Sequence, residues 1–391
     1  MINNKPFFLF LSWRDIKSPK AGGAELHTHD VIRVMNKDKY DAVLFTPKYE
    51  GLLAEEIIDG VKHLRRGNAL SVIFWAFVYF LKNRNKIDYV VEQCNTHRFF
   101  TRFWVPARKR IFYIHQLTRE IWDINMKFPF NKIGKILETP MLRLQRHDYV
   151  FTVSQSTKQD LIAIGFNENK IMIIPSAIEK RFLGIPLDDE IEQKQHDFVY
   201  VGRYSKYKGI DASIEALGIV RKTYIDSKLR IVGKIDEKVV KEVIEPFSKK
   251  YGFTFGKEPD NDIVLCGFVS EEDKYSIMKN SLALLFPSIR EGWGLIVTEA
   301  AAMGTPSIVY DNPGCRDAVN YGKAGYMCSQ NTPENLAEQM IMCIEKKKEY
   351  EAKRNAAYNY AQQFSWDNNT IIIEDILSKI LLNECAKNDE K

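Results

Sequence analysis

The sequence of 391 residues lacks a long hydrophobic run, a Cys-x-x-Cys pair and a large excess of charge of one sign. The most apolar window, Ala69–Leu81, is too short to cross a bilayer, and we expect a buried helix there. The six cysteines are scattered, which indicates reduced cytosolic thiols used mostly for packing. A net charge of only +5 does not by itself indicate a nucleic-acid partner.

The first residues also lack the long apolar core and small-residue cleavage site of a signal peptide, and Phe7–Leu11 instead reads as a strand. We therefore expect a cytoplasmic protein. The composition, 45% hydrophobic and 27% charged, is that of a globular chain, and the length favours two or three domains. No His, Cys, Asp or Glu cluster with metal-ligand spacing is visible, so no metal is expected.

Short apolar runs rich in Val, Ile and Phe alternate with helical runs along the whole chain. Before residue 179, strands are expected at Phe7–Leu11, Ala42–Phe45, Tyr89–Glu92, Arg110–Ile114, Tyr149–Val153 and Ile171–Ile174. After residue 195 they are expected at Asp197–Val201, Lys228–Val232, Asp262–Cys266, Leu282–Phe286 and Ser307–Tyr310. This alternation is typical of parallel sheets covered by helices on both faces, so the sequence predicts two Rossmann-like α/β domains.

The domain boundaries follow from polar stretches and the last amphipathic run. We expect an N-terminal domain over 1–178, a linker over 179–196, a C-terminal domain over 197–364, a final helix over 365–383 and a polar tail over 384–391. Ligands of doubly wound sheets bind at the carboxyl ends of the strands. With two such sheets facing each other, the site is expected in a deep cleft between the domains.

The most informative motif is Glu291 followed eight residues later by Glu299. The motif follows an apolar strand, contains a turn with Gly292 and Gly294, and ends in the start of a helix. Glycines let a ligand approach the backbone, and a helix N-terminus attracts phosphate. Two carboxylates on either side of such a turn suit the hydroxyl groups of a sugar nucleotide.

A second motif follows the first strand of the second domain, where Arg203 and Lys208 lie five residues apart in a loop that leads into a helix. A diphosphate leaving group gains negative charge as a glycosidic bond breaks, and fixed cations stabilise that charge. Taken alone, these residues read better as solvated surface cations, and it is the downstream pair Glu291 and Glu299 that favours a diphosphate site.

Two features of the first domain complete the pattern. The loop Ala21–Glu25 is rich in glycine and precedes a helix, but it lacks the G-x-G-x-x-G spacing of a nicotinamide dinucleotide site. His115 ends an apolar strand at its carboxyl edge, where sites form. The alternative for a lone His is a hydrogen-bonded core residue.

Together these motifs resemble the retaining glycosyltransferases of family 4, which have the GT-B fold. The resemblance implies transfer of a hexose-type sugar from a UDP- or GDP-sugar donor to an acceptor hydroxyl of a glycan or a lipid-linked molecule, in polysaccharide or glycolipid synthesis. It also implies roles for individual residues. Glu291 would bind sugar hydroxyls, and Glu299 would bind the ribose. The diphosphate would be bound by Arg203, Lys208 and the N–H groups of Leu295 and Ile296, with Gly23 also beside the donor phosphates. The loop around Phe268 would contact the base, and His115 would contact the reacting sugar.

The family needs no metal or other cofactor, because fixed cations and helix ends take its place. Its proposed mechanism is front-face attack, in which the departing phosphate accepts the acceptor's proton. Alternatives that remain open are a sugar-nucleotide epimerase of the same fold and a non-catalytic binding or scaffold protein. Glycoside hydrolysis is disfavoured, because eight helical residues would separate the two glutamates by ~12 Å, beyond the usual ~5–9.5 Å.

One segment is unusually basic. Thr96–Arg146 holds eleven Lys or Arg against three acidic residues, with aromatic residues interleaved. Such a surface suits an anionic membrane or an anionic acceptor. The alternative is a solvated face above core aromatics. Because no nucleic-acid motif accompanies it, we expect peripheral contact with the inner face of the plasma membrane rather than nucleic acid.

Overall fold

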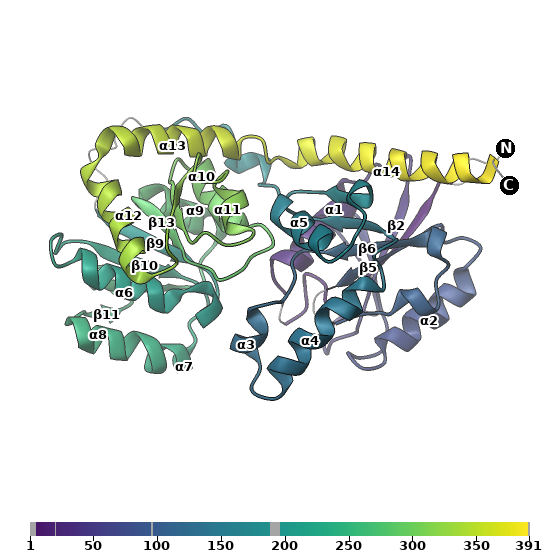
Figure 1. The fold of residues 1–391 in the computed structure, drawn as a ribbon, viewed down its shortest axis with the longest axis horizontal. Helices are drawn as coiled ribbons and strands as arrows, with labels where there is room; N and C mark the ends of the chain where they lie inside the picture. Colours follow the sequence, from purple (N-terminus) through teal and green to yellow (C-terminus); the bar gives the residue numbers. More distant parts are fainter. Residues whose placement is uncertain (1–4, 20, 95–96, 188–195, 390–391) are drawn as a thin grey trace. The chain divides into compact units, whose positions relative to one another are not determined.

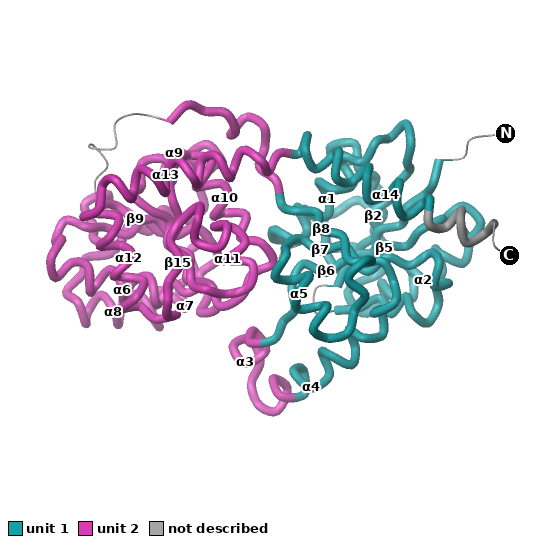
Figure 2. Tube along the Cα trace, turned by 45° about the horizontal axis from the view of Figure 1, so that its top comes forward, with its two compact units in different colours: residues 1–119, 133–176, 366–391 teal, residues 120–132, 177–365 magenta. Residues whose placement is uncertain are grey.

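The computed structural model describes residues 5–19, 21–94, 97–187 and 196–389. The chain forms two compact units (Figure 2). The first consists of Met1–Arg119, Ile133–Ser176 and Trp366–Lys391, and the second of Glu120–Lys132 and Ala177–Ser365. Each unit is built on one sheet (Figure 1), so the prediction of two α/β domains with parallel sheets is confirmed.

The sheet of the first unit has the strand order β3-β4-β2-β1-β5-β6-β7-β8. Its strands are β1 (Phe7–Leu11), β2 (Asp41–Thr46), β3 (Glu55–Ile58), β4 (Val61–Arg65), β5 (Tyr89–Cys94), β6 (Arg110–Ile114), β7 (Tyr149–Thr152) and β8 (Ile171–Ile173). All neighbours are parallel except β3 and β4, which form a hairpin that the sequence analysis did not predict. Its strands are short and partly charged, and Asp59 and Gly60 form the turn with positive φ.

Side chains of the strands alternate between the two faces of this sheet. Phe8 and Phe10 share a core with helices α1 (Gly23–Val34) and α14 (Trp366–Asp389). Leu9 and Leu11 pack on the other face beneath α2 (Val72–Asn83). On that second face, Phe112 and Val150 lie beneath α4 (Phe130–Arg143) and α5 (Gln155–Ala163).

The second unit has a fully parallel sheet in the order β11-β12-β10-β9-β13-β14-β15. Its strands are β9 (Asp197–Val201), β10 (Lys228–Val232), β11 (Phe255–Gly256), β12 (Ile263–Gly267), β13 (Ala283–Phe286), β14 (Ser307–Val309) and β15 (Tyr326–Met327). Helices α6 (Ile210–Val220), α8 (Glu245–Tyr251) and α12 (Pro333–Glu345) border the core on one face, and α9 (Glu271–Asn280), α10 (Leu295–Ala302) and α11 (Cys315–Ala318) the core on the other. Helix α13 (Lys347–Ala361) packs against α10.

Some expected boundaries differ from those of the structure. Residues 120–132, expected in the first domain, belong to the second unit, because Arg290 holds Glu120 and α3 (Ile121–Asn125) packs beside residues 206–208. The last helix continues to Asp389, through the expected polar tail. Part of the expected linker 179–196, residues 188–195, lies outside the described residues.

Two expectations about burial are also corrected. Helix α2 is not a buried helix, because Phe74 and Trp75 on its outer side are exposed. In the basic segment, Arg98 and Arg110 are buried in ion pairs with Glu92 and Asp148. Those two cations therefore serve the packing of the first unit rather than its surface.

Candidate functional site

The predicted residues of the second unit follow three strands, β9, β12 and β13, which lie side by side with β10 in its sheet. Arg203 and Lys208 follow β9, Phe268 follows β12 and Glu291 follows β13, while β10 lies between β9 and β12. In a parallel sheet the carboxyl ends of neighbouring strands share one edge. The fold therefore gathers at one edge residues that are up to 88 positions apart in the sequence.

Lys208 and Glu291 form an ion pair of 2.5 Å, and both side chains are largely buried. Burial by itself would lower the pKa of Lys208, but the neighbouring Glu291 carboxylate outweighs burial and raises it. The two loops also touch through their backbones, since the Ile289 N–H donates to the carbonyl of Tyr207 at 2.9 Å. Lys208 is thus a fixed cation held at the edge of the sheet.

Gly209 explains how the two loops come so close. Its φ is +74°, a conformation that favours glycine, and a Cβ placed there would lie 2.4 Å from the carbonyl oxygen of Pro287. Any other residue at this position would push the β9 and β13 loops apart. Arg203, in the same loop, has an exposed side chain and donates to the Tyr207 hydroxyl at 2.7 Å.

Helix α10 begins directly after the glycine turn, with Gly294 as its N-cap at φ +95°. Leu295 and Ile296 are its first residues, so no carbonyl of the helix itself accepts their N–H groups. Both are only partly buried. The helix therefore presents donors and the positive end of its dipole beside Glu291. Phe268, on the loop after β12, is 89% exposed.

Glu299 is buried in α10 and its carboxylate is paired with Lys274 of α9 at 2.8 Å. Burial raises the pKa of Glu299, and Lys274 offsets only part of that effect. A carboxylate has about four acceptor positions, so one ion pair leaves others for hydroxyl groups. Lys274 was missed from the sequence, because a single Lys in a polar helix carries no pattern.

The segment that precedes α11 holds the Glu291 turn in place. The Pro313 carbonyl accepts from the Glu291 N–H at 3.1 Å, and Asn312 donates to the Ser288 carbonyl at 2.9 Å. A Cβ on Gly314, which has φ +79°, would lie 2.2 Å from the Glu291 carbonyl oxygen. The dipeptide Pro-Gly before a helix was the available sequence signal, but it did not reveal which loop it supports.

In the first unit, Gly23 is the first residue of α1. Glu25 accepts from the Gly22 N–H at 2.8 Å and pairs with Arg14 at 3.0 Å, which fixes the start of the helix against the loop after β1. His115 lies just beyond β6, and its ring stacks on Tyr113 with centroids 4.7 Å apart. Among the described residues, neither ring nitrogen of His115 has a hydrogen-bond partner.

The surroundings keep His115 neutral. Burial lowers its pKa well below the ordinary value, and His27 nearby lowers it further. His27 itself accepts from the Tyr113 hydroxyl and contacts the Pro175 carbonyl at 3.2 Å, an arrangement that places its proton on Nε2. Asn369 of α14 donates to the same carbonyl at 2.6 Å, so the last helix supports this cluster.

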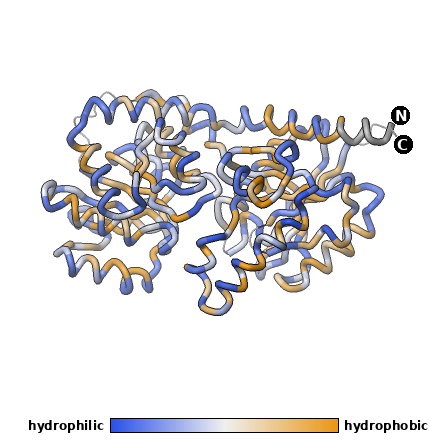
Figure 3. Tube along the Cα trace, in the orientation of Figure 1, coloured by the Kyte–Doolittle hydropathy of each residue, from blue (hydrophilic) through white to orange (hydrophobic). Residues whose placement is uncertain are grey.

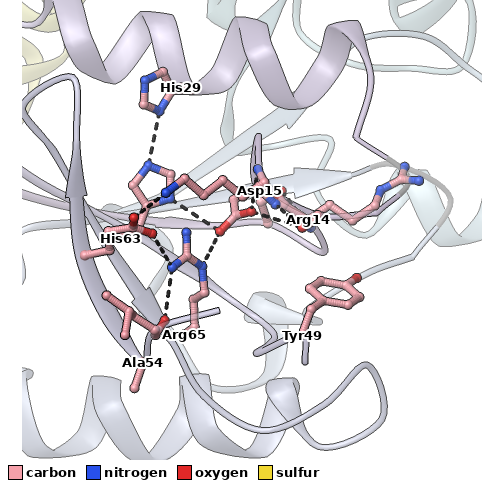
Figure 4. Close-up of polar contacts among 12 residues, drawn as sticks. Arg14, Asp15, His29, Tyr49, Ala54, His63 and Arg65 are labelled. Atoms are coloured by element: carbon pink, nitrogen blue, oxygen red, sulfur yellow. Dashed lines mark hydrogen bonds and ion pairs between the residues drawn. The ribbon is translucent and has the colours of Figure 1, made fainter. Parts of the chain in front are cut away.

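A separate buried network lies beneath the loop after β1 (Figure 4). Asp15 contacts Arg65 at 2.5 Å and His63 at 3.5 Å, and His63 contacts His29 at 3.1 Å. Burial alone would raise the pKa of Asp15, but hydrogen bonds from His63 and Arg65 outweigh it and hold the pKa well below its usual range. Because these side chains are fully buried, we assign the network to holding the loop, not to binding a ligand.

Comparison with known proteins covers both units. The model of the glycosyl transferases group 1 matches residues 187–363, and that of Glycosyltransferase Family 4 matches residues 21–181. An uncharacterized glycosyltransferase of Methanocaldococcus jannaschii is 22% identical over 89% of this chain and 92% of its own length. The poly(glycerol-phosphate) alpha-glucosyltransferase of Bacillus subtilis is 23% identical over 72% of this chain, but the match spans only 41% of that protein.

Solved structures show the same fold at low identity. Sucrose-phosphate synthase from Thermosynechococcus elongatus has a TM-score of 0.76 at 15% identity, covering 97% of this chain and 100% of that one. Anabaena HepE in complex with UDP and glucose has a TM-score of 0.71 at 18% identity, covering 96% and 100%. The fold, the loops at the sheet edge and both family matches agree: this chain belongs to the group 1/family 4 glycosyltransferases and has the GT-B fold.

Proposed function

We propose that this glycosyltransferase moves a hexose-type sugar from a UDP- or GDP-sugar to an acceptor hydroxyl with retention of configuration. The observation that carries the proposal is the Lys208–Glu291 pair beside the start of α10. A buried cation, a carboxylate and free helix N–H groups are the groups that a sugar diphosphate needs. The complex of HepE with UDP and glucose supports UDP as the first donor to test.

In this proposal Lys208 exchanges its partner when the donor binds. Its ammonium group and Arg203 neutralise the diphosphate together with the N–H groups of Leu295 and Ile296. Glu291, released from the ion pair, accepts hydrogen bonds from sugar hydroxyls. Glu299 accepts from the ribose while it remains paired with Lys274.

The reaction breaks the bond between C1 of the sugar and the diphosphate oxygen and forms a bond from C1 to the acceptor oxygen on the same face. The acceptor's proton passes to the departing diphosphate, whose charge Lys208 and Arg203 stabilise. His115 is neutral, and its ring nitrogens have no hydrogen-bond partner in the described part of the chain, so we assign it to a hydroxyl of the reacting sugar. No step requires a metal.

The acceptor is proposed to be a growing glycan or a lipid-linked molecule in cell-surface polysaccharide or glycolipid synthesis, used at the inner face of the membrane. The name of the Bacillus relative, a glucosyltransferase that acts on poly(glycerol phosphate), supports a polymeric acceptor. Among the described residues, no three His, Cys, Asp or Glu side chains are grouped to hold a metal ion. We therefore expect donor turnover to persist in excess EDTA.

The test is a thermal-shift screen with UDP, GDP and ADP, followed by release of nucleotide from the matching donors with and without EDTA. Stabilisation by one diphosphate and metal-independent release of sugar with its α configuration are the expected results. Conversion of the donor to an epimer without sugar release would favour an epimerase. Binding of a diphosphate without any turnover, even with acceptors added, would favour a non-catalytic binding protein.

A further inference from the structure

The outer side of α2 is unusually apolar for a surface helix. Its Val72, Ala76 and Phe80 face the sheet and are buried, whereas Phe74 and Trp75 are 60% and 43% exposed. Leu70 and Leu81 at the two ends of the helix are also exposed. An apolar outer face is costly in water unless something covers it, and large exposed apolar patches mark interaction sites.

Neighbouring residues extend this face. Phe103 is 73% exposed, and the adjacent Trp104 packs against Phe77 and Phe80 of α2. Helix α4, on the same side of the sheet, is amphipathic. Its Leu142 is buried, while Ile136 is 70% exposed. Figure 3 shows hydrophobic residues along both helices.

A basic border accompanies the apolar face. Lys82, Arg84 and Lys86, at and beyond the end of α2, are exposed, and so are Arg102, which precedes Phe103 in the sequence, and Arg108. Aromatic and aliphatic side chains beside Lys and Arg fit the interface of an anionic bilayer, where rings reach the acyl boundary and cations meet the headgroups. A second copy of the chain fits less well, because a two-fold contact would bring the same cations together.

We propose that the outer faces of α2 and α4 form one docking surface for an anionic phospholipid bilayer. Phe74, Trp75 and Phe103 would enter the interfacial region of the bilayer. Among the described residues, no helix is both long and apolar enough to span a membrane. This inference rests on the proposed function, because membrane docking would bring the enzyme to a lipid-linked acceptor. Vesicle binding can be measured without sugar transfer, so the two proposals are tested separately.

The experiment is sedimentation of the full chain with vesicles of phosphatidylcholine, alone or with phosphatidylglycerol, at low and high salt. The wild type should bind only the anionic vesicles, and high salt should release most of it. Two variants test the surface. The double variant F74S/W75S removes the apolar part, and the triple variant K82S/R84S/K86S removes charge, and each should weaken binding at least about tenfold.

Matched controls lie in the second unit. Ile225→Ser removes another exposed apolar residue, and the triple variant K238S/K241S/K249S removes the same number of exposed cations. Both should bind vesicles like the wild type. Circular dichroism and thermal melting establish that each variant is folded. If the apolar variant is unfolded, the charge variant still decides the question.

The proposal is wrong if the wild type ignores anionic vesicles at low salt, or if both α2 variants bind them as well as the controls do. A wild-type dimer that F74S/W75S converts to a monomer with unchanged vesicle binding would identify a second copy as the occupant. Donor turnover is scored separately. A chain that binds vesicles through α2 but releases no sugar would keep this inference and overturn the proposed function.

Discussion

Lys208 and Arg203 differ in how the protein holds them, although both belong to one loop. Lys208 is largely buried against Glu291, whereas Arg203 has an exposed side chain. A cation already held at the proposed diphosphate site stabilises the developing charge more effectively than a side chain that must first be ordered from solvent.

Replacing either Lys208 or Arg203 by Ala should lower turnover about 10²-fold, a loss of about 3 kcal/mol of transition-state stabilisation. The measurement is steady-state release of nucleotide from the donor. Lys206→Ala, in the same loop and exposed, is the matched control and should retain normal turnover. Near-normal activity in both test variants would refute the diphosphate assignment.

Substitutions of the two glutamates should weaken the binding of different ligands. Glu299→Ala should weaken binding of the free nucleoside diphosphate, because its proposed partner is the ribose. Glu291→Ala should leave diphosphate binding almost intact and impair binding of the intact donor. Calorimetry with each ligand measures both effects. Equal losses for both ligands in both variants would contradict this division of roles.

At the level of elements, the turn before α11 matters because its Pro313 carbonyl accepts from the Glu291 N–H and so supports the Glu291 loop. Gly314→Ala would force a side chain into a φ of +79° and a Cβ to within 2.2 Å of the Glu291 carbonyl. We expect the loop to move and turnover to fall about 10²-fold, because a displacement of about 1 Å in a site has effects of that size.

Gly322→Ala is the control for Gly314→Ala. Gly322 has φ +81°, so the backbone strain is similar, but the nearest atom would be 3.7 Å from the new Cβ. The Gly322→Ala substitution should lower the stability of the protein slightly and leave turnover unchanged. If both variants lose turnover equally, backbone strain rather than support of Glu291 is the cause.

Helix α14, near the C-terminal end of the chain, helps to position His27 of α1. Its Ile373 and Ile376 are buried in the core with Phe8 and Tyr113, and Asn369 holds the Pro175 carbonyl that His27 also contacts. The apolar stripe of this helix was visible in the sequence. Its contact with the His27 cluster was not, because Pro175 and Asn369 are brought together only by the fold.

For the whole molecule, the buried histidines predict how stability depends on pH. Burial lowers the pKa of His27 to about 4, against an ordinary value of 6.5 in the unfolded chain. Between these values the unfolded state binds more protons, so stability is present above about pH 6.5 and is lost as the pH falls toward 4. This histidine alone accounts for a loss on the order of 3 kcal/mol.

Hydrogen exchange of α1 amides at pH 7 and pH 4.5 measures this loss in the first unit alone, after correction for the intrinsic rate. His27→Asn should lower protection at pH 7 but make it depend less on pH. His29, whose pKa burial also lowers to about 4, should retain part of the dependence. A variant with the full wild-type pH dependence would contradict the assignment to His27.

The sequence by itself determined the class of fold and most strands, whereas the donor chemistry it indicates for the loops stays a prediction. The runs Phe7–Leu11, Arg110–Ile114, Asp197–Val201 and Lys228–Val232 form strands with those bounds, because strands with helices on both faces are largely apolar. The glycines before α10 likewise led to the prediction of a phosphate site at the start of that helix.

Only the tertiary structure decided which residues touch and which faces remain open. Lys208 is 83 positions from Glu291, and their pairing follows from the neighbouring positions of β9 and β13 in the sheet. The apolar run of α2 has the same composition whether one side or both sides are covered. Its outer face is exposed because the sheet covers a single side of the helix, and packing of that kind is a property of the fold, not of local sequence.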